Sequence, residues 1–223
     1  MNAILRTSNN PKVFSQLNCL LSFDIINHFF VIIDAKKDST TAEALKLHPS
    51  ASLITTISLQ NYGWSTALNK AIEKIKEMNF EKYDLLIISN EVEVKKEELI
   101  SLKNCLSSSN ACCGYSLFSN RTEFSYTLPR NTFIIWKNKV IFNGESFLEN
   151  LDNIGMEDYE MILRLYKDKG LLPYIGAKNV TLCSHPCEEK LIRESSAINT
   201  IKTYYSSEII NAVDKHIKTQ NNI

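Results

Sequence analysis

The stretch Phe29-Phe-Val-Ile-Ile-Asp34 decides the fold. Its five apolar residues stand in an unbroken row and end at an aspartate. A continuous apolar run of this length, with no polar alternation, is typical of a β-strand that is buried on both faces of a parallel sheet. The polar residues 35–41 would then lie at the carboxyl end of the strand, which is where such sheets bind their ligands.

Strand-like and helix-like segments alternate on both sides of this run. The other strand-like segments are short, apolar and often β-branched: residues 3–5, 53–59, 83–88 and 111–118. Between them, apolar residues recur at helical spacing, as in the segment 67–78. This alternation predicts an α/β protein with a mostly parallel central sheet flanked by helices.

The second half of the chain has a different pattern. Thr132–Trp136 and Val140–Phe142 flank the polar Lys137–Lys139, which predicts an antiparallel hairpin, and two more short strands are expected near 172–175 and 180–183. The tail carries apolar residues on one helical face, which could pack on the sheet or on a second copy of the chain: Ile198, Ile201, Tyr205, Ile209, Ala212 and His216. The sheet is therefore expected to be mixed in this half.

Composition excludes several classes of protein. The chain has 223 residues, of which 44% are hydrophobic and 22% charged, so it can bury a substantial core. Its 25 basic residues balance its 25 acidic ones, which gives no electrostatic footprint for nucleic acid or an anionic membrane. No apolar run approaches the roughly 18 residues of a spanning helix, so we expect a soluble, cytoplasmic protein.

The six cysteines do not form the dense framework of a secreted domain, and we expect reduced thiols. Cys183-Ser-His185-Pro-Cys187 offers three metal ligands without a second pair at zinc spacing, so ordinary thiols are favoured there over a zinc site. Trp64 and Trp136 stand among apolar residues and are predicted to pack in the core.

Polar residues cluster at four places where a predicted strand ends or a predicted helix begins. These are Asp34 with Asp38, the segment 61–69, Ser89-Asn90-Glu91, and Glu157-Asp158. Taken singly, each has an ordinary structural explanation, because aspartate caps helices, asparagine and glycine form turns, and acidic residues favour a helix N-terminus. Their order along the chain is more informative than any one of them.

In that order the chain resembles the family 2 glycosyltransferases of the GT-A fold. Leu5–Asn9, which contains Thr7, looks like the first strand of that family and its polar exit. Val31–Asp34, followed by Asp38–Thr40, is similar to the loop that holds the base of a nucleotide sugar. Asn61-Tyr-Gly63, with Ala67 and Asn69, resembles the family's Asn-x-Gly…Ala-x-Asn helix start.

Two further matches concern the chemistry. Asp84–Val92 occupies the place of the strand that runs into the family's metal-binding Asp-x-Asp motif, and Ser89-Asn90-Glu91 stands at the motif itself. Gly155–Tyr159, with Leu163–Leu165 and Gly170 after it, resembles the Glu-Asp motif whose aspartate is the usual catalytic base of inverting members. His185 follows the last predicted strand, where some relatives place a histidine near the metal; a structural histidine before a proline is the favoured alternative.

The resemblance implies a GT-A-type domain over residues 1–187, with a nucleotide-binding half (1–110), an acceptor half (111–187) that contains a small mixed or antiparallel portion, and a helical tail (188–223). It implies an enzyme that transfers a sugar, with inversion, from a nucleotide-sugar donor to a hydroxyl of a glycan, lipid-linked saccharide or protein, as in polysaccharide biosynthesis. Donors in this family are most often UDP-linked.

The resemblance also implies a role for each matching residue. Asp158 would be the general base and Glu157 would help to position the acceptor. The donor would be held by Thr7, Asp34, Asn69, Ser89 and Asn90, and a Mn²⁺ or Mg²⁺ ion by Glu91 and His185. Because Ser89 and Glu91 stand where the family has two aspartates, a nucleotide-sugar-binding or regulatory module without turnover is the alternative.

A nucleotidyltransferase on a related α/β sheet ranks last among the hypotheses. That class needs a glycine-rich, basic phosphate loop near the first strand, and Arg6–Lys12 contains no glycine. Acceptors of family 2 glycosyltransferases are often lipid-linked and the tail has one apolar face, so peripheral association with the inner face of the membrane and a homodimer through the C-terminal helix are both compatible with the sequence.

Overall fold

One mixed sheet forms the centre of the computed structural model, which describes residues 1–7, 12–36, 38–60, 63–121, 127–128, 130, 132–151, 156–183 and 188–221. Within these residues the sheet has eight strands in the order β3-β2-β1-β4-β7-β6-β8-β5. The strands are β1 (Asn2–Arg6), β2 (His28–Asp34), β3 (Ile54–Leu59), β4 (Leu85–Ser89), β5 (Val92–Glu93), β6 (Cys113–Phe118), β7 (Phe133–Trp136) and β8 (Tyr174–Leu182).

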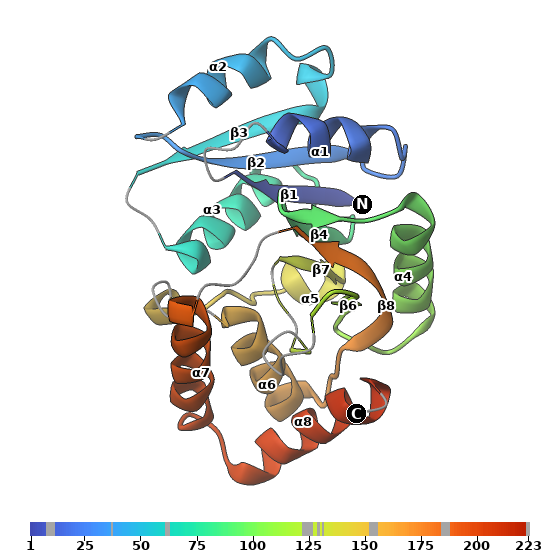
Figure 1. Cartoon of the computed structure of the whole chain (residues 1–223), viewed down its shortest axis with the longest axis vertical. Coiled ribbons are helices and arrows are strands. Elements are labelled where there is room, and N and C mark those ends of the chain that lie inside the picture. The colour runs from blue at the N-terminus through green and yellow to red at the C-terminus, as the bar shows by residue number, and fades with distance from the viewer. Residues whose placement is uncertain are drawn as a thin grey trace.

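The first half of the sheet is parallel, as the buried run at residues 29–33 predicts. Strand β1 lies between β2 and β4 and is parallel to both, and β3 extends the sheet beside β2 (Figure 1). Strand β7 is antiparallel to its neighbours β4 and β6, while β6 and β8 are parallel to each other. The α/β class and the mixed sheet are therefore confirmed.

Helices cover both faces of the sheet. They are α1 (Lys12–Leu21), α2 (Ser39–Lys46), α3 (Trp64–Glu77), α4 (Lys96–Ser108), α5 (Asn138–Ile141), α6 (Glu157–Lys169), α7 (Glu188–Lys202) and α8 (Ser207–Asn221). Short 3-10 turns at Ala51–Leu53 and Glu149–Leu151 complete the described helical structure. Among the described helices, none is long and apolar enough to cross a membrane.

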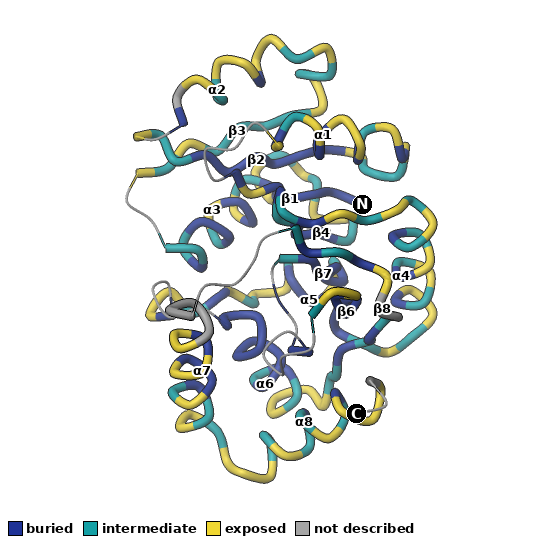
Figure 2. The backbone as a smooth tube through the Cα atoms, viewed as in Figure 1, coloured by how far each residue is buried: buried dark blue, intermediate teal, exposed yellow. Residues whose placement is uncertain are grey.

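Side chains alternate between the two faces and form two cores, because successive residues of a strand point to opposite sides. In β1, Ile4 packs in the core beneath α3 and α6, whereas Ala3 and Leu5 pack in the core beneath α1 and α4. The central strands are accordingly buried, while the outer sides of the helices are exposed (Figure 2).

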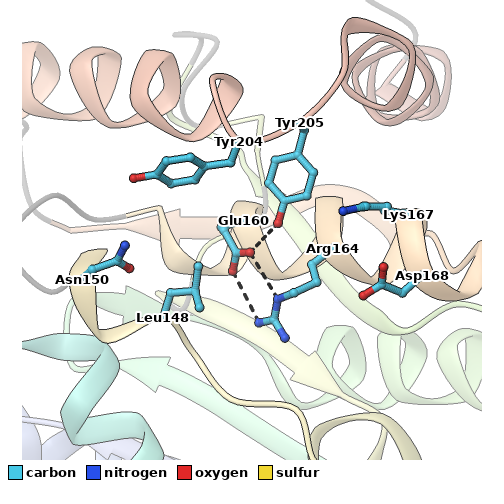
Figure 3. Close-up of a pocket in the computed structure, with 8 residues that line it drawn as sticks. All are labelled: Leu148, Asn150, Glu160, Arg164, Lys167, Asp168, Tyr204 and Tyr205. Carbon is cyan, nitrogen blue, oxygen red and sulfur yellow. Dashed lines mark hydrogen bonds and ion pairs between the residues drawn. The ribbon is translucent and has the colours of Figure 1, made fainter.

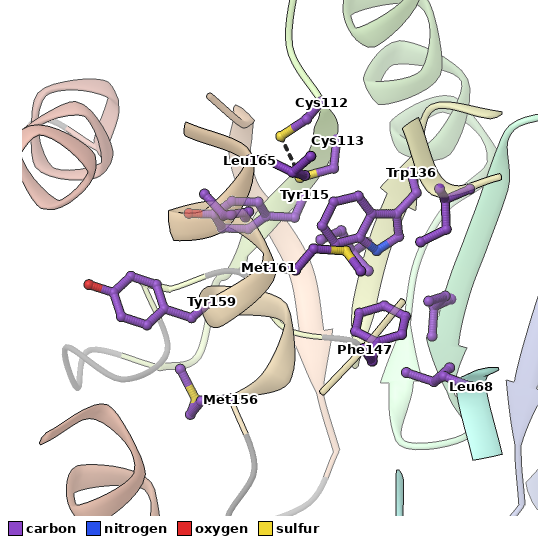
Figure 4. Packing of buried hydrophobic residues seen from close by; sticks show 14 of the residues in the cluster. Leu68, Cys112, Cys113, Tyr115, Trp136, Phe147, Met156, Tyr159, Met161 and Leu165 are labelled. Carbon is purple, nitrogen blue, oxygen red and sulfur yellow. Dashed lines mark hydrogen bonds between the residues drawn. The ribbon is translucent and has the colours of Figure 1, made fainter. Parts of the chain in front are cut away.

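The core beneath α6 is built from large side chains. Trp136 is fully buried, as predicted, and meets the ring of Phe147 edge-on with 6.1 Å between ring centroids. Tyr159 and Met161 of α6 pack in the same cluster, and so do the adjacent thiols of Cys112 and Cys113 (Figure 4). Both of these cysteines are free and buried.

Two sequence-based expectations for residues 132–183 are wrong. The predicted hairpin does not form, because residues 138–141 make the short helix α5, whose first amide donates to the Asp84 carboxylate at 3.0 Å. The two short strands predicted near 172–183 are one strand, β8.

Gly176 of β8 lies so close to β6 that a Cβ there would stand 2.7 Å from the Ser116 hydroxyl.

The tail forms two helices instead of one. The chain turns between α7 and α8, and Tyr205 lies in this turn instead of on the predicted helical face. Of the predicted apolar face, Ile198 and Ile201 are buried within the chain itself, and Tyr205 and Ile209 are partly buried against the same core. Much of the apolar face that suggested a homodimer is therefore covered by the same molecule.

Candidate functional site

The carboxyl edge of the parallel strands is the candidate site. Arg6, the last residue of β1, lies in register with Ile32 of β2 and with Ser89 of β4. The residues that follow these strands must therefore emerge along one edge of the sheet, the end toward which the β1 and β2 arrows point in Figure 1. The structure thus brings Thr7, Asp34 and Ser89 to the same edge, as the sequence predicts.

A buried carboxylate connects two of these strand exits. The Thr7 hydroxyl donates to Asp38 Oδ2 at 2.7 Å, and the Thr41 hydroxyl donates to Asp38 Oδ1. Asp38 is only 1% exposed and Thr7 only 4%. Asp38 precedes α2, yet its side chain makes no capping bond to the helix backbone. Its role in the described structure is to hold the exit of β1 against the start of α2.

Asp34 shapes the turn at the end of β2. Its Oδ1 accepts a hydrogen bond from the Lys36 amide at 3.0 Å. The amide of Ala35, between these two residues, donates to the Leu59 carbonyl of β3. The Asp34 side chain is half-buried. It stands at the edge as predicted, but its contact with a nucleotide stays a prediction.

The exit of β4 is fixed from both sides. The Ser89 amide donates to the Thr132 carbonyl at 2.9 Å, and the Glu91 carbonyl accepts from the Cys183 amide at the end of β8 at 2.7 Å. The Ser89 hydroxyl accepts from the Glu91 amide at 3.3 Å. Asn90 between them is buried, so this exit is a rigid turn that offers the half-buried side chain of Glu91 at the edge.

Two cations flank the first strand exit, and neither was predicted as a site residue. Arg6 is exposed and lies over the ring of Trp64, with its guanidinium carbon 4.6 Å from the ring centroid. Trp64 is half-buried, so it packs against the core and also supports a cation, whereas only core packing was predicted. Lys12 is exposed at the first turn of α1. Arg6 and Lys12 stand on either side of the mostly polar residues 7–11, so the sequence alone could have identified them as candidate phosphate-binding cations.

Asn69 braces the scaffold away from the strand exits. Its Nδ2 donates to the Phe147 carbonyl at 2.9 Å, and its Oδ1 accepts from the Phe147 amide, also at 2.9 Å. The same Nδ2 lies 3.2 Å from Glu149 Oε1. Both ends of the amide are engaged with residues 147–149, which ties α3 to the segment before α6.

Glu157 and Asp158 open α6 and are buried, at 4% and 2% exposed. Asp158 Oδ1 accepts a hydrogen bond from the Tyr159 amide at 2.9 Å. Burial raises the pKa of Tyr115 well above its ordinary value, and the negative charge of Asp158 adds to this effect. Asp158 therefore lies beside core groups at the start of α6.

The described residues contain no group of three or more His, Cys, Asp or Glu side chains that could hold a metal ion. His185, predicted to bind a metal, lies outside the described residues, as do Cys187 and Asn61. What the described edge offers are separate carboxylates, Glu91 and Asp34. These suit Mg²⁺ that arrives bound to substrate phosphates, since Mg²⁺ needs only one or two protein carboxylates.

A cavity of about 360 Å³ lies on the opposite side of α6 from the core (Figure 3). Glu160, 1% exposed, accepts hydrogen bonds there from the Tyr205 hydroxyl at 2.5 Å and from Arg164 Nε at 3.2 Å. Arg164 also pairs with Glu145 at 2.7 Å. Lys169 pairs with the other oxygen of Glu145 at 2.6 Å, so two cations balance the two carboxylates. The hydrogen bond from Tyr205 fastens the turn between α7 and α8 to α6, so the cavity is explained by the packing of the tail.

Comparison with known proteins adds evidence on the fold. No protein-family model matches the sequence, and no curated protein matches it. Among solved structures, 4-diphosphocytidyl-2C-methyl-D-erythritol synthase from Anaerococcus prevotii aligns with a TM-score of 0.56 and 9% identity, over 87% of this chain and 94% of that one. Another structure of a synthase of this name has a TM-score of 0.55 and 13% identity, over 86% of this chain and 96% of that one. At such low identity the likeness establishes the shared fold.

The expected membership of the family 2 glycosyltransferases is wrong. The similar structures are synthases of a diphosphocytidyl compound, which places them among nucleotidyltransferases instead of sugar transferases. Sugar transfer from a UDP-linked donor with Asp158 as base, polysaccharide biosynthesis, and the alternative of an inactive nucleotide-sugar module fall with it. The physical reason is that polar residues at strand ends are common to α/β sheets with unrelated functions, so their order does not identify one reaction.

Proposed function

We propose that this protein is a nucleotidyltransferase that binds a nucleoside triphosphate at the carboxyl edge of β1, β2 and β4. The proposal is carried by one observation: a fold shared with diphosphocytidyl compound synthases presents cations and fixed polar groups at that edge. Arg6 and Lys12 flank the exit of β1, Asp34 is the last residue of β2, and Glu91 follows β4. The absence of glycine from Arg6–Lys12 made a nucleotidyltransferase the least favoured hypothesis from sequence, and the shared fold now favours it.

The reaction would join the nucleotide to an acceptor that carries a phosphate. An oxygen of the acceptor phosphate attacks the α-phosphorus, the bond from that phosphorus to the bridging oxygen breaks, and pyrophosphate leaves with the electron pair. A phosphate monoester has its second pKa near 6, so the attacking oxygen is already largely deprotonated at neutral pH. The step therefore requires no general base, which agrees with the burial of Asp158.

The demand that remains is electrostatic. A triphosphate and an acceptor phosphate repel each other, so the site must supply positive charge and fixed donors. Arg6 is suited to this role because the Trp64 ring supports its guanidinium, which can donate two parallel hydrogen bonds to a phosphate. A Mg²⁺ ion bound to the triphosphate would screen the phosphates further, with Glu91 or Asp34 as its protein ligand.

Pyrophosphate release tests the proposal. The purified protein is incubated with Mg²⁺, each of the four nucleoside triphosphates and a panel of sugar and polyol phosphates. We expect release that needs both a triphosphate and a phosphorylated acceptor. Arg6→Gln should lower the rate by about tenfold or more, because a charged hydrogen bond to phosphate contributes about 1.5–3 kcal/mol.

Lys46→Gln is the matched control. Lys46 is an exposed cation in the last turn of α2, and its partner is the equally exposed Glu43. This variant should keep the native rate. Release that is equal in Arg6→Gln and native protein would contradict the placement of the phosphates. No release with any pair, together with no binding of any triphosphate, would contradict the function itself.

A further inference from the structure

We infer that the cavity between α1 and the segment after β4 receives the base of the nucleotide, an inference that rests on the proposed function. The cavity measures about 260 Å³ and is lined by one flank of α1, the start of β5 and the end of β8. Cavities that hold whole drug-sized ligands measure about 300–1,000 Å³. This one is therefore matched to a single ring system and not to a complete nucleotide.

Two buried amide side chains line the cavity and are incompletely satisfied. Gln16 is 9% exposed; its Nε2 donates to the Val92 carbonyl at 2.9 Å, which leaves Oε1 as the free end. Asn90 is 6% exposed. Across the part of the chain that the structure describes, Gln16 Oε1 and Asn90 Nδ2 are shielded from water and have no hydrogen-bond partner.

Such a pair of atoms indicates the chemistry of the ligand. Buried polar atoms are nearly always hydrogen-bonded, and leaving one unpaired costs about 1–3 kcal/mol. Gln16 Oε1 needs a donor and Asn90 Nδ2 needs an acceptor. Each nucleobase presents donors and acceptors in its own pattern, so the positions of these two atoms favour the base whose pattern matches them. The apolar side chains of Leu20, Val92 and Val94 line the same cavity and suit the faces of a planar ring.

The position of the cavity agrees with the proposed phosphate site. Asn90 stands between Ser89 and Glu91 at the exit of β4, and Lys12 at the start of α1 also lines the cavity. A base bound against Gln16, one helical turn beyond Lys12, would leave the phosphates beside Lys12 at the strand exits. Lys12 and Asn90 thus belong both to the cavity and to the candidate site.

Base discrimination tests the inference. Dissociation constants are measured by calorimetry for CTP, UTP, ATP and GTP with Mg²⁺, and for the four free nucleosides. We expect the native protein to favour one base at least tenfold over the weakest. Asn90→Ala and Gln16→Met should each weaken the favoured nucleotide about three- to tenfold and bring the four constants to within about threefold of one another.

Asn104→Ala on the exposed side of α4 is the matched amide control and should leave all constants unchanged. Urea unfolding of each variant separates lost binding from lost folding. The base preference is judged from whichever of Asn90→Ala and Gln16→Met keeps the native unfolding midpoint. An unchanged base preference in that variant would overturn the inference while the proposed function stands. Nucleosides that bind and depend on Asn90 would support the cavity even if triphosphates release no pyrophosphate; no binding of either would overturn both.

Discussion

The hydrogen bonds between Thr7, Asp38 and Thr41 allow a quantitative prediction. The Asp38 carboxylate is 1% exposed and accepts both threonine hydroxyls, with 2.7 Å between Thr7 Oγ1 and Asp38 Oδ2. A hydrogen bond to a charged group contributes about 1.5–3 kcal/mol. Thr7→Val should therefore lower the free energy of unfolding by about 2 kcal/mol. Asp38→Ala removes the acceptor of both hydroxyls and should lower it by about 3–4 kcal/mol.

A double-mutant cycle isolates the bond itself. In Thr7→Val/Asp38→Ala the loss should be smaller than the sum of the single losses by about 1.5–2 kcal/mol, because each single change already removes the shared bond. Urea unfolding followed by circular dichroism measures all four proteins, and Thr40→Val on the exposed first turn of α2 is the control. Single effects that add to within about 0.5 kcal/mol would refute the tie between the exit of β1 and the start of α2.

Three further predictions concern the scaffold. Tyr205→Phe removes a hydrogen-bond donor from the buried Glu160 and should destabilise the protein by about 1–2 kcal/mol in urea unfolding. An unchanged unfolding midpoint would contradict the conclusion that this bond fastens the turn before α8 to α6. Asn69→Leu should lower the free energy of unfolding by about 1–3 kcal/mol and leave triphosphate binding intact in calorimetry. Weaker triphosphate binding at native stability would instead support the predicted contact of Asn69 with the nucleotide. Burial lowers the pKa of His28, so the unfolded chain takes up its proton first and stability falls as the pH drops below about 6.5. His28→Phe, which keeps the stacking on Phe80, should lose less stability than native protein between pH 7 and pH 5; equal losses would contradict this.

The parallel half of the fold could be predicted because its signals are local. The apolar run Phe29–Ile33 identifies a strand buried on both faces, and Asp34 at its end identifies the edge that carries the candidate site. The errors arose where a distant residue decides the structure. Asn138 begins a helix because Asp84 caps it from 54 positions away, and Asn69 is held by Phe147, 78 positions away.

The choice of reaction failed for a different reason. Asp158 and Ser89-Asn90-Glu91 were interpreted by their order along the chain, and order does not report burial. The structure shows that Asp158 is only 2% exposed, which its place in the sequence could not indicate. Arg6 was overlooked because its support comes from Trp64, which lies 58 positions later in the chain and was assigned to the core alone.

Hydrogen exchange with and without a Mg²⁺-bound nucleoside triphosphate tests the proposed nucleotide site at the carboxyl edge of the sheet, because it reports where the ligand binds. We expect slower exchange at the amides of residues 38–41 and 89–92, at and after the ends of β2 and β4, and no change in α8. Protection confined to α6 and the turn before α8, or no protection at any concentration of the four triphosphates, would contradict a nucleotide site at the carboxyl edge of the sheet.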